Sequence, residues 1–235
     1  MQVLLIKDYS TEQIWGSLMT ESFKLHIARH EPNVELDVCE ACEGESIPSI
    51  DKYDLIILTG GTFNLLGTSY DKYPVWVQQV LATIRDLDGS QNKAKVLGFC
   101  WGHQAIQFAK GATLAPLATG PRIGVENVNL TPAGEDMFGL TTLNLMKFHK
   151  RYVKSTALGF TPLAASNEIF ISDSNKVLSF QGHPEMTERI AQELIDADDG
   201  TYCVDTHNVP GGLKGIETAH DGDLVWEKIM KWARQ

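Results

Sequence analysis

A short apolar strand that ends in a cysteine is the feature that most constrains this chain. Residues 96–99 form an apolar run, Cys100 follows it directly, and helix-compatible residues continue from Ala105. Gly98 and Gly102 stand two residues either side of the cysteine. Side chains at those positions would collide in a tight strand-to-helix turn, so the pattern predicts a nucleophile elbow. The elbow also places the sulfur at the positive end of a helix dipole, which favours thiolate over thiol.

The first 110 residues alternate between strand and helix patterns. The predicted strands cover residues 3–6, 34–38 and 53–58, and the predicted helices cover residues 11–30 and 73–87. This alternation predicts an α/β fold with a doubly wound, mostly parallel sheet and helices on both faces. In such sheets the active crevice lies at the carboxyl ends of the strands, and Gly60, Gly61 and Cys100 all stand at such ends.

From about residue 112 the pattern changes to short strands separated by turns. The candidates are residues 125–130, 143–148, 161–165, 169–172 and 176–180. They predict a small antiparallel extension, and we expect residues 1–235 to form one flavodoxin-like domain. Pro184 suits the first position of a helix that continues over residues 188–197. Residues 198–222, rich in Gly, Asp and Thr, predict a surface loop, and residues 224–232 predict a closing helix.

Composition excludes several classes of protein. A chain of 235 residues with 43% hydrophobic residues can bury a large core without disulfides. The net charge of −10 argues against nucleic acid or an anionic membrane surface as a partner. Four cysteines are too few for a disulfide framework, and the apolar N-terminal run is too short for a secretory signal. We therefore expect a cytoplasmic protein, and no apolar run approaches the length of a membrane span.

Two patterns resemble metal sites but have too few ligands. Cys39 and Cys42 form a lone C-x-x-C that follows a predicted strand, and we interpret it as incidental. His26 and His30 are four residues apart on a predicted helix without a third ligand, which favours a solvated helix face. The sequence thus predicts no metal and no cofactor.

His183 and Glu185 are candidates for the base and the orienting group that a cysteine nucleophile needs. A base must take the thiol proton and return it to a leaving amine, and a further group must orient the base. His183 follows the predicted strand over residues 176–180, so it too can lie at the carboxyl edge of the sheet. Glu185 can accept from the second ring nitrogen. The alternatives are a His-Pro-Glu sequence with only a structural role at a helix start, and a Cys100 that is a small buried hydrophobe.

The sequences GFCWGHQ at 98–104 and QGHPE at 181–185 resemble the motifs of class I (triad) glutamine amidotransferases. The chain is similar to free-standing GMP-synthetase-type amidotransferase domains and to γ-glutamyl peptidases, from the first strand to the last helix. The resemblance implies a triad of Cys100, His183 and Glu185, an oxyanion hole made by the N–H groups of Gly61 and Trp101, and substrate contacts from Gly60, Gln104 and His149.

Three of these assignments leave alternatives. His149 is either a residue at the pocket rim or a plain surface histidine. Residues 62–67 depart from the proline and short acidic or serine loop of many family members, which leaves the shape of the oxyanion loop and the choice of substrate open. Asp205 and His207 lie in the predicted loop, where they could touch substrate, but nothing in the pattern favours that role.

The resemblance implies that Cys100 attacks the γ-carbonyl of a glutamyl group, forms a thioester, and releases glutamate when water enters. The sequence has no G-x-x-x-x-G-K-[ST] loop and no room for a second domain. We therefore favour hydrolysis of glutamine or a γ-glutamyl peptide, with that small molecule as the partner. The alternatives are an ammonia-supplying subunit of a separate synthetase, a related α/β family with an elbow cysteine but other partners, and a non-catalytic regulatory protein of this fold.

Overall fold

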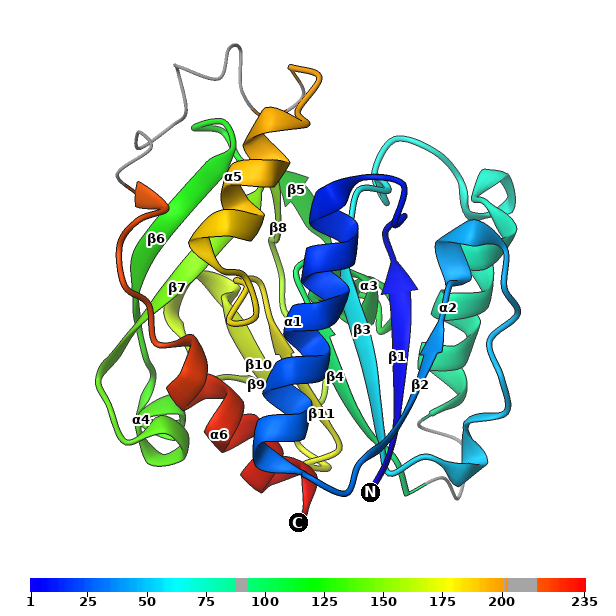
Figure 1. The fold of residues 1–235 in the computed structure, drawn as a ribbon, viewed down its shortest axis with the longest axis horizontal. Coiled ribbons are helices and arrows are strands. Elements are labelled where there is room, and N and C mark those ends of the chain that lie inside the picture. Colours follow the sequence, from blue (N-terminus) through cyan, green and yellow to red (C-terminus); the bar gives the residue numbers. More distant parts are fainter. Residues whose placement is uncertain (88–92, 201, 203–214) are drawn as a thin grey trace.

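A seven-stranded sheet organises the chain, in a computed structural model that describes residues 1–87, 93–200, 202 and 215–235 (Figure 1). The strand order is β2-β1-β3-β4-β11-β10-β9. The bounds are β1 Gln2–Asp8, β2 Glu35–Cys39, β3 Leu55–Gly61, β4 Lys95–Phe99, β9 Phe160–Pro162, β10 Ile169–Ser172 and β11 Val177–Phe180. The five strands from β2 to β11 pair in parallel, and β10 is antiparallel to both of its neighbours.

Helices cover both faces of this sheet (Figure 1). Helices α1 (Ile14–His30), α5 (Glu188–Asp196) and α6 (Gly222–Ala233) lie on one face, and α2 (Val75–Asp86) and α3 (Trp101–Ala109) lie on the other. Side chains of β1 alternate between the two cores: Val3 and Leu5 face α1, while Leu4 and Ile6 face α2. All four are fully buried, as expected of a parallel strand covered on both sides. The predicted fold class is therefore confirmed.

The second half of the chain adds two ribbons to the sheet. One pairs β6 (Arg122–Asn129) with β7 (Thr142–His149), and the other pairs β5 (Leu114–Pro116) with β8 (Arg151–Val153). The remaining elements are α4 (Pro132–Phe138) and 3-10 turns at Ala41–Glu43, Ile50–Lys52, Tyr70–Lys72 and Ala165–Asn167. Strands β5 and β8 have three residues each, too few for a period-2 pattern to be visible in the sequence.

The prediction that Pro184 begins a helix is wrong. Pro184 lies in a turn after β11, and α5 begins at Glu188. The hydroxyl of Thr187 accepts the backbone N–H of Ile190 at 3.3 Å, so Thr187 is the N-cap that starts the helix. Most of the predicted loop over residues 198–222, with Asp205 and His207, lies outside the described residues.

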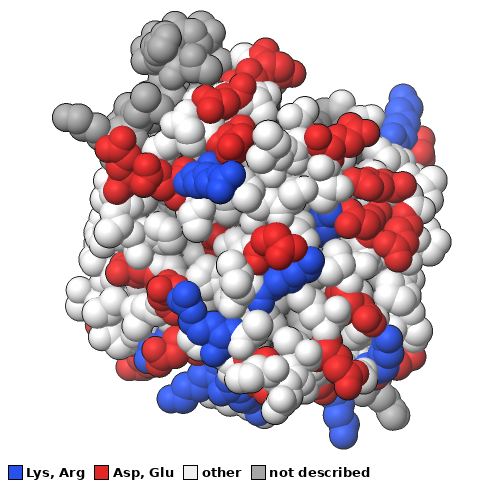
Figure 2. Space-filling view, viewed as in Figure 1, with Lys and Arg blue, Asp and Glu red and all other residues white. Residues whose placement is uncertain are grey.

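The surface reflects the acidic composition. On the face shown in Figure 2, acidic side chains are spread widely, and most of the basic ones lie in the lower half. No helix among the described residues combines the length and the hydropathy that a membrane span needs.

Candidate active site

Cys100 occupies a strained turn between β4 and α3. Its backbone has φ +46° and ψ −96°, a conformation that non-glycine residues rarely adopt. A Cβ atom on Gly98 would lie 2.5 Å from Cδ1 of Ile106, and one on Gly102 would lie 2.5 Å from the carbonyl oxygen of Leu58. Both glycines are therefore required for β4, α3 and β3 to approach one another, as the elbow pattern predicts.

The sulfur of Cys100 lies where three strands end. The backbone N–H of Cys100 donates to the carbonyl of Phe180 at the end of β11, at 2.8 Å. Its Sγ lies 3.8 Å from the carbonyl oxygen of Phe148 near the end of β7. Trp101 is the first residue of α3, so its N–H is one of those that a helix leaves without an intrahelical acceptor. That N–H is available to a ligand beside the sulfur.

His183 and Glu185 form a buried pair after β11. Nδ1 of His183 lies 2.7 Å from Oε1 of Glu185, and the two residues are 4% and 1% exposed. The backbone N–H of His183 donates to the carbonyl of Met146 on β7 at 2.8 Å, and Ser22 on α1 donates its hydroxyl to the carbonyl of Glu185 at 2.6 Å. The turn that carries the pair is thus held from both sides.

The charge state of His183 is set by its two polar neighbours. Burial alone would lower the pKa of the imidazole, but the charges of Glu185 and Cys100 outweigh burial and raise this pKa well above its ordinary value. These surroundings therefore favour the imidazolium form of the ring, whose Nδ1–H donates to Glu185. Its Nε2 meets no hydrogen-bond partner of normal geometry among the described residues, and Cys100 acts on the ring through its charge and through hydrogen bonding, so the thiol is the polar neighbour of this ring besides Glu185.

Gly60 brings the cysteine and the histidine to one place. A Cβ atom on Gly60 would lie 3.0 Å from Cε1 of His183 and 3.7 Å from Cβ of Cys100, so both side chains lie on the same side of this residue. The register of β3 against β1 shifts between Ile6 and Asp8, so that Gly61 pairs with Asp8.

A small cavity adjoins this cluster. It has a volume of about 60 Å³ and is lined by Cys100, His183, Gly60, Gly61 and several apolar side chains. A second cavity of about 400 Å³ lies next to it. The two share the lining residues Trp15, Thr62, Phe148, Leu194 and Tyr202. The thiol therefore faces a space that a substrate can enter.

The structure does not bring Gln104 and His149 to this cavity. Gln104 is buried, and its Nε2 donates to the carbonyl of Arg151 and to Oε1 of Gln181, both at 3.0 Å. His149 is 2% exposed and lies neither at the surface nor at the cavity's rim. Its Nδ1 donates to the carbonyl of Arg151 at 2.9 Å, and burial, assisted by the charge of Lys147, lowers the pKa of His149 to about 3.

The two sequence patterns that resemble metal sites, His26 with His30 and Cys39 with Cys42, include side chains that are packed into the fold. The ring of His26 stacks on that of Trp226 of α6, with centroids 5.2 Å apart, and its side chain is only 14% exposed. The expectation of a solvated helix face is therefore wrong at His26, because α6 packs there. Cys39 is buried at the end of β2, and burial raises the pKa of both Cys39 and Cys42 to about 11. Within the described ranges, no three potential metal ligands cluster.

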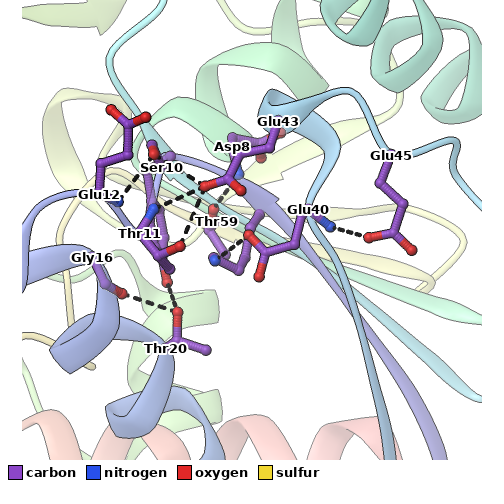
Figure 3. A network of polar contacts seen from close by, with 12 residues as sticks. Asp8, Ser10, Thr11, Glu12, Gly16, Thr20, Glu40, Glu43, Glu45 and Thr59 are labelled. Carbon is purple, nitrogen blue, oxygen red and sulfur yellow. Dashed lines mark hydrogen bonds and ion pairs between the residues drawn. The ribbon is translucent and has the colours of Figure 1, made fainter.

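The aromatic wall of the cavity has no signal in the sequence motifs. Tyr9 follows β1, and its hydroxyl hydrogen-bonds that of Thr20 at 3.0 Å. Figure 3 shows the network that holds this segment, in which the carboxylate of Glu43 accepts from the hydroxyl of Ser10 and from the N–H and hydroxyl of Thr11. Single aromatic residues outside the two motifs carry no sequence signal for this position, because distant segments supply them.

Comparison with known proteins gives concordant results. The family model described as glutamine amidotransferase class-I matches residues 8–198. The glutamine amidotransferase-like protein chry6 of Gibberella zeae is 35% identical over 99% of this chain and 95% of its own length. Gamma-glutamyl peptidase 3 of Arabidopsis thaliana is 26% identical over 77% of this chain and 74% of its own length. A crystal structure of a glutamine amidotransferase from Thermotoga maritima superposes with a TM-score of 0.78, at 20% identity, covering 100% of this chain and 99% of that one.

Proposed function

Because this chain belongs to the class-I glutamine amidotransferase family, we propose that it hydrolyses a γ-glutamyl amide through a covalent thioester on Cys100. The substrate is glutamine or a γ-glutamyl peptide. The observation that carries the proposal is the buried His183–Glu185 pair on the same side of Gly60 as the thiol. A nucleophile, a base and an orienting carboxylate in this order are the parts that acyl transfer needs.

In the first half of the reaction, the Cys100 thiolate attacks the γ-carbonyl carbon. The oxygen becomes an oxyanion beside the N–H groups of Gly61 and Trp101, and preorganised donors of this kind typically contribute about 3 kcal/mol each. The tetrahedral intermediate collapses when the carbon–nitrogen bond breaks. His183 gives its Nε2 proton to the departing nitrogen, which leaves as ammonia or an amine, and the glutamyl group remains as a thioester.

In the second half, water replaces the amine. His183, now neutral, takes a proton from the water as it attacks the thioester carbon. The carbon–sulfur bond then breaks, glutamate leaves, and the imidazolium–thiolate pair is restored. Glu185 keeps its hydrogen bond to Nδ1 throughout, which fixes the tautomer that presents Nε2 to the reaction.

The test is glutamate release from glutamine, glutathione and γ-glutamyl anilide, measured for the purified protein. Cys100→Ala should reduce the rate by at least about 10³-fold, because the covalent route is lost. Cys42→Ala is the matched control, since Cys42 lies outside the cavity, and it should retain the wild-type rate. Equal rates for Cys100→Ala and the wild type, or no release from any of the three compounds, would contradict the proposal.

A further inference from the structure

The scissile bond of the substrate must lie in the cavity beside Cys100; this step rests on the function proposed above. The 60 Å³ cavity is lined by Cys100, by His183 and by the backbone of Gly61, the three groups that the reaction uses. His183 is the acid that must reach the departing nitrogen, so this nitrogen lies against the His183 ring. The chemistry of the remaining lining then indicates which end of the substrate it suits.

The walls of this cavity are apolar. Apart from Cys100, His183 and residues 60–62, its lining consists of Tyr9, Trp15, Met19, Phe148, Met186, Leu194 and Tyr202. None of these side chains is a lysine, arginine, aspartate or glutamate. The α-ammonium and α-carboxylate of a glutamyl group would lose hydration there without a counter-charge, at a high cost in free energy. The lining therefore favours an uncharged apolar group on this side of the scissile bond.

Three aromatic rings connect the inner cavity with the 400 Å³ cavity outside it, because Trp15, Phe148 and Tyr202 line both. The rings of Phe148 and Tyr202 have centroids 4.9 Å apart, and the rings of Trp15 and Tyr9 have centroids 5.4 Å apart. Aromatic walls of this kind offer a flat partner both area and favourable ring geometry.

Tyr202 has one contact through its backbone and another through its ring. Its backbone N–H donates to both carboxylate oxygens of Asp198, at 3.0 and 3.1 Å. The ammonium of Lys150 lies over the ring, 4.9 Å from its centroid. Charged groups thus stand at the outer cavity, which Lys150, Asp198 and Asp199 also line, whereas the lining that the two cavities share has no charged side chain.

We propose that the physiological leaving group is an arylalkylamine, an amine with an aromatic body and no charged substituent, and that Trp15, Phe148 and Tyr202 select it. The amine nitrogen lies in the inner cavity beside His183, and the aromatic body lies against the three rings and extends into the outer cavity. When glutamine is the substrate, the departing ammonia makes no contact with these rings, so glutamine is a poor substrate by comparison.

The experiment compares γ-glutamyl benzylamide with γ-glutamyl methylamide. Both release primary alkylamines, and the change in the ratio of their kcat/KM values between wild type and ring variants reports recognition of the ring, because the leaving-group chemistry is the same in every variant. We expect a ratio of about 10 to 100 in favour of the benzylamide, from the apolar area that the ring buries. Glutamine should be cleaved about as poorly as the methylamide.

Variants of the aromatic residues test which side chains produce the preference for the benzylamide. Trp15→Ala and Tyr202→Ala should each lower the benzylamide-to-methylamide ratio by about fivefold or more, because each removes one ring of the wall. This ratio does not depend on how much of the variant is folded. Leu25→Ala is the matched control, since Leu25 lies on the same helix as Trp15 with 68% exposure, and it should leave the ratio unchanged.

The outcomes separate the two proposals. A wild-type ratio near one, or a ratio that both ring variants leave intact, overturns the aromatic leaving group while γ-glutamyl hydrolysis stands. Absence of hydrolysis of these two amides, of glutamine and of glutathione overturns the proposed function itself. A high ratio that falls in Trp15→Ala and Tyr202→Ala but not in Leu25→Ala supports both.

Discussion

Two buried histidines that are close enough to influence each other's charge have opposite electrostatic surroundings. His183 follows β11 and His149 ends β7, and they are 4% and 2% exposed. The pKa of His183 is raised because the charges of Glu185 and Cys100 outweigh burial. The pKa of His149 is lowered to about 3, first by burial and then by the charge of Lys147. One ring is therefore charged at neutral pH, and the other is neutral.

The two pKa values differ in direction because the Nδ1 atoms of the two rings have different hydrogen-bond partners. The Nδ1 of His183 faces a carboxylate at 2.7 Å, whereas the Nδ1 of His149 donates to the backbone carbonyl of Arg151 at 2.9 Å. A carboxylate stabilises an imidazolium far more than a neutral carbonyl does. A nearby carboxylate, rather than burial at the end of a strand, therefore makes a histidine suitable for proton transfer here.

Replacing the carboxylate should make His183 resemble His149. In Glu185→Gln, burial of the ring is no longer opposed by a carboxylate, and the imidazole becomes neutral near pH 7. Loss of the acid that protonates the leaving amine should reduce kcat/KM by about 10²-fold or more. Steady-state glutamate release at pH 7 measures this effect, which is the largest expected for any residue other than Cys100.

The pH profile distinguishes loss of charge from misfolding. Since the pKa of His183 is raised in the wild type, its imidazolium persists above pH 6.5 and activity should fall only at alkaline pH. In Glu185→Gln the alkaline decline of kcat/KM should move to lower pH, while the circular dichroism spectrum stays the same. An alkaline decline at the same pH in both proteins would show that Glu185 does not set the charge of His183.

A methyl group at residue 60 should disturb His183 without touching His149. The Cβ of Gly60→Ala would lie 3.0 Å from Cε1 of His183, so the ring must move by a few tenths of an ångström. We expect kcat/KM to fall by about tenfold, because proton transfer depends on small displacements. The melting temperature should change little, because the atom that must move belongs to a side chain.

Gly61→Ala provides the contrast for that variant. Its Cβ would lie 2.5 Å from the backbone carbonyl oxygen of Asp8, which cannot move without separating β1 from β3. This variant should therefore lose stability as well as activity. Equal melting temperatures for Gly60→Ala and Gly61→Ala would contradict the assignment of different neighbours to the two glycines.

The sequence allowed prediction of those parts of the molecule that depend on neighbouring residues. The apolar run before Cys100, the glycines around it and the two-residue spacing of His183 and Glu185 are all local, and the strand, the elbow and the polar pair are where they were expected. The alternation in the first 110 residues likewise predicted the parallel sheet correctly. Their roles in catalysis remain predictions.

Features that depend on tertiary packing could not be predicted. His149 was expected at a rim or a surface, but the pairing of β6 with β7 and the cover from later segments place it inside. Gln104 was expected on the substrate, but it bonds Arg151 and Gln181 across the core. The aromatic wall combines α1, the end of β7 and the segment after α5, and no local pattern links these segments.

The smallest expected effect concerns the stability contributed by His149. Its pKa is about 3 in the folded chain and near 6.5 when unfolded, so between these values the unfolded chain binds a proton that the folded chain does not. Stability should therefore fall as the pH drops below 6.5, by at most about 1.4 kcal/mol per pH unit from this group. His149→Gln keeps a donor for the carbonyl of Arg151 but cannot be protonated. In urea unfolding at pH 8 and pH 5, the wild type should lose more stability on acidification than His149→Gln does. Parallel losses in the two proteins would show that His149 is no less basic than an exposed histidine, and the contrast with His183 would then rest on Glu185 and Cys100 alone.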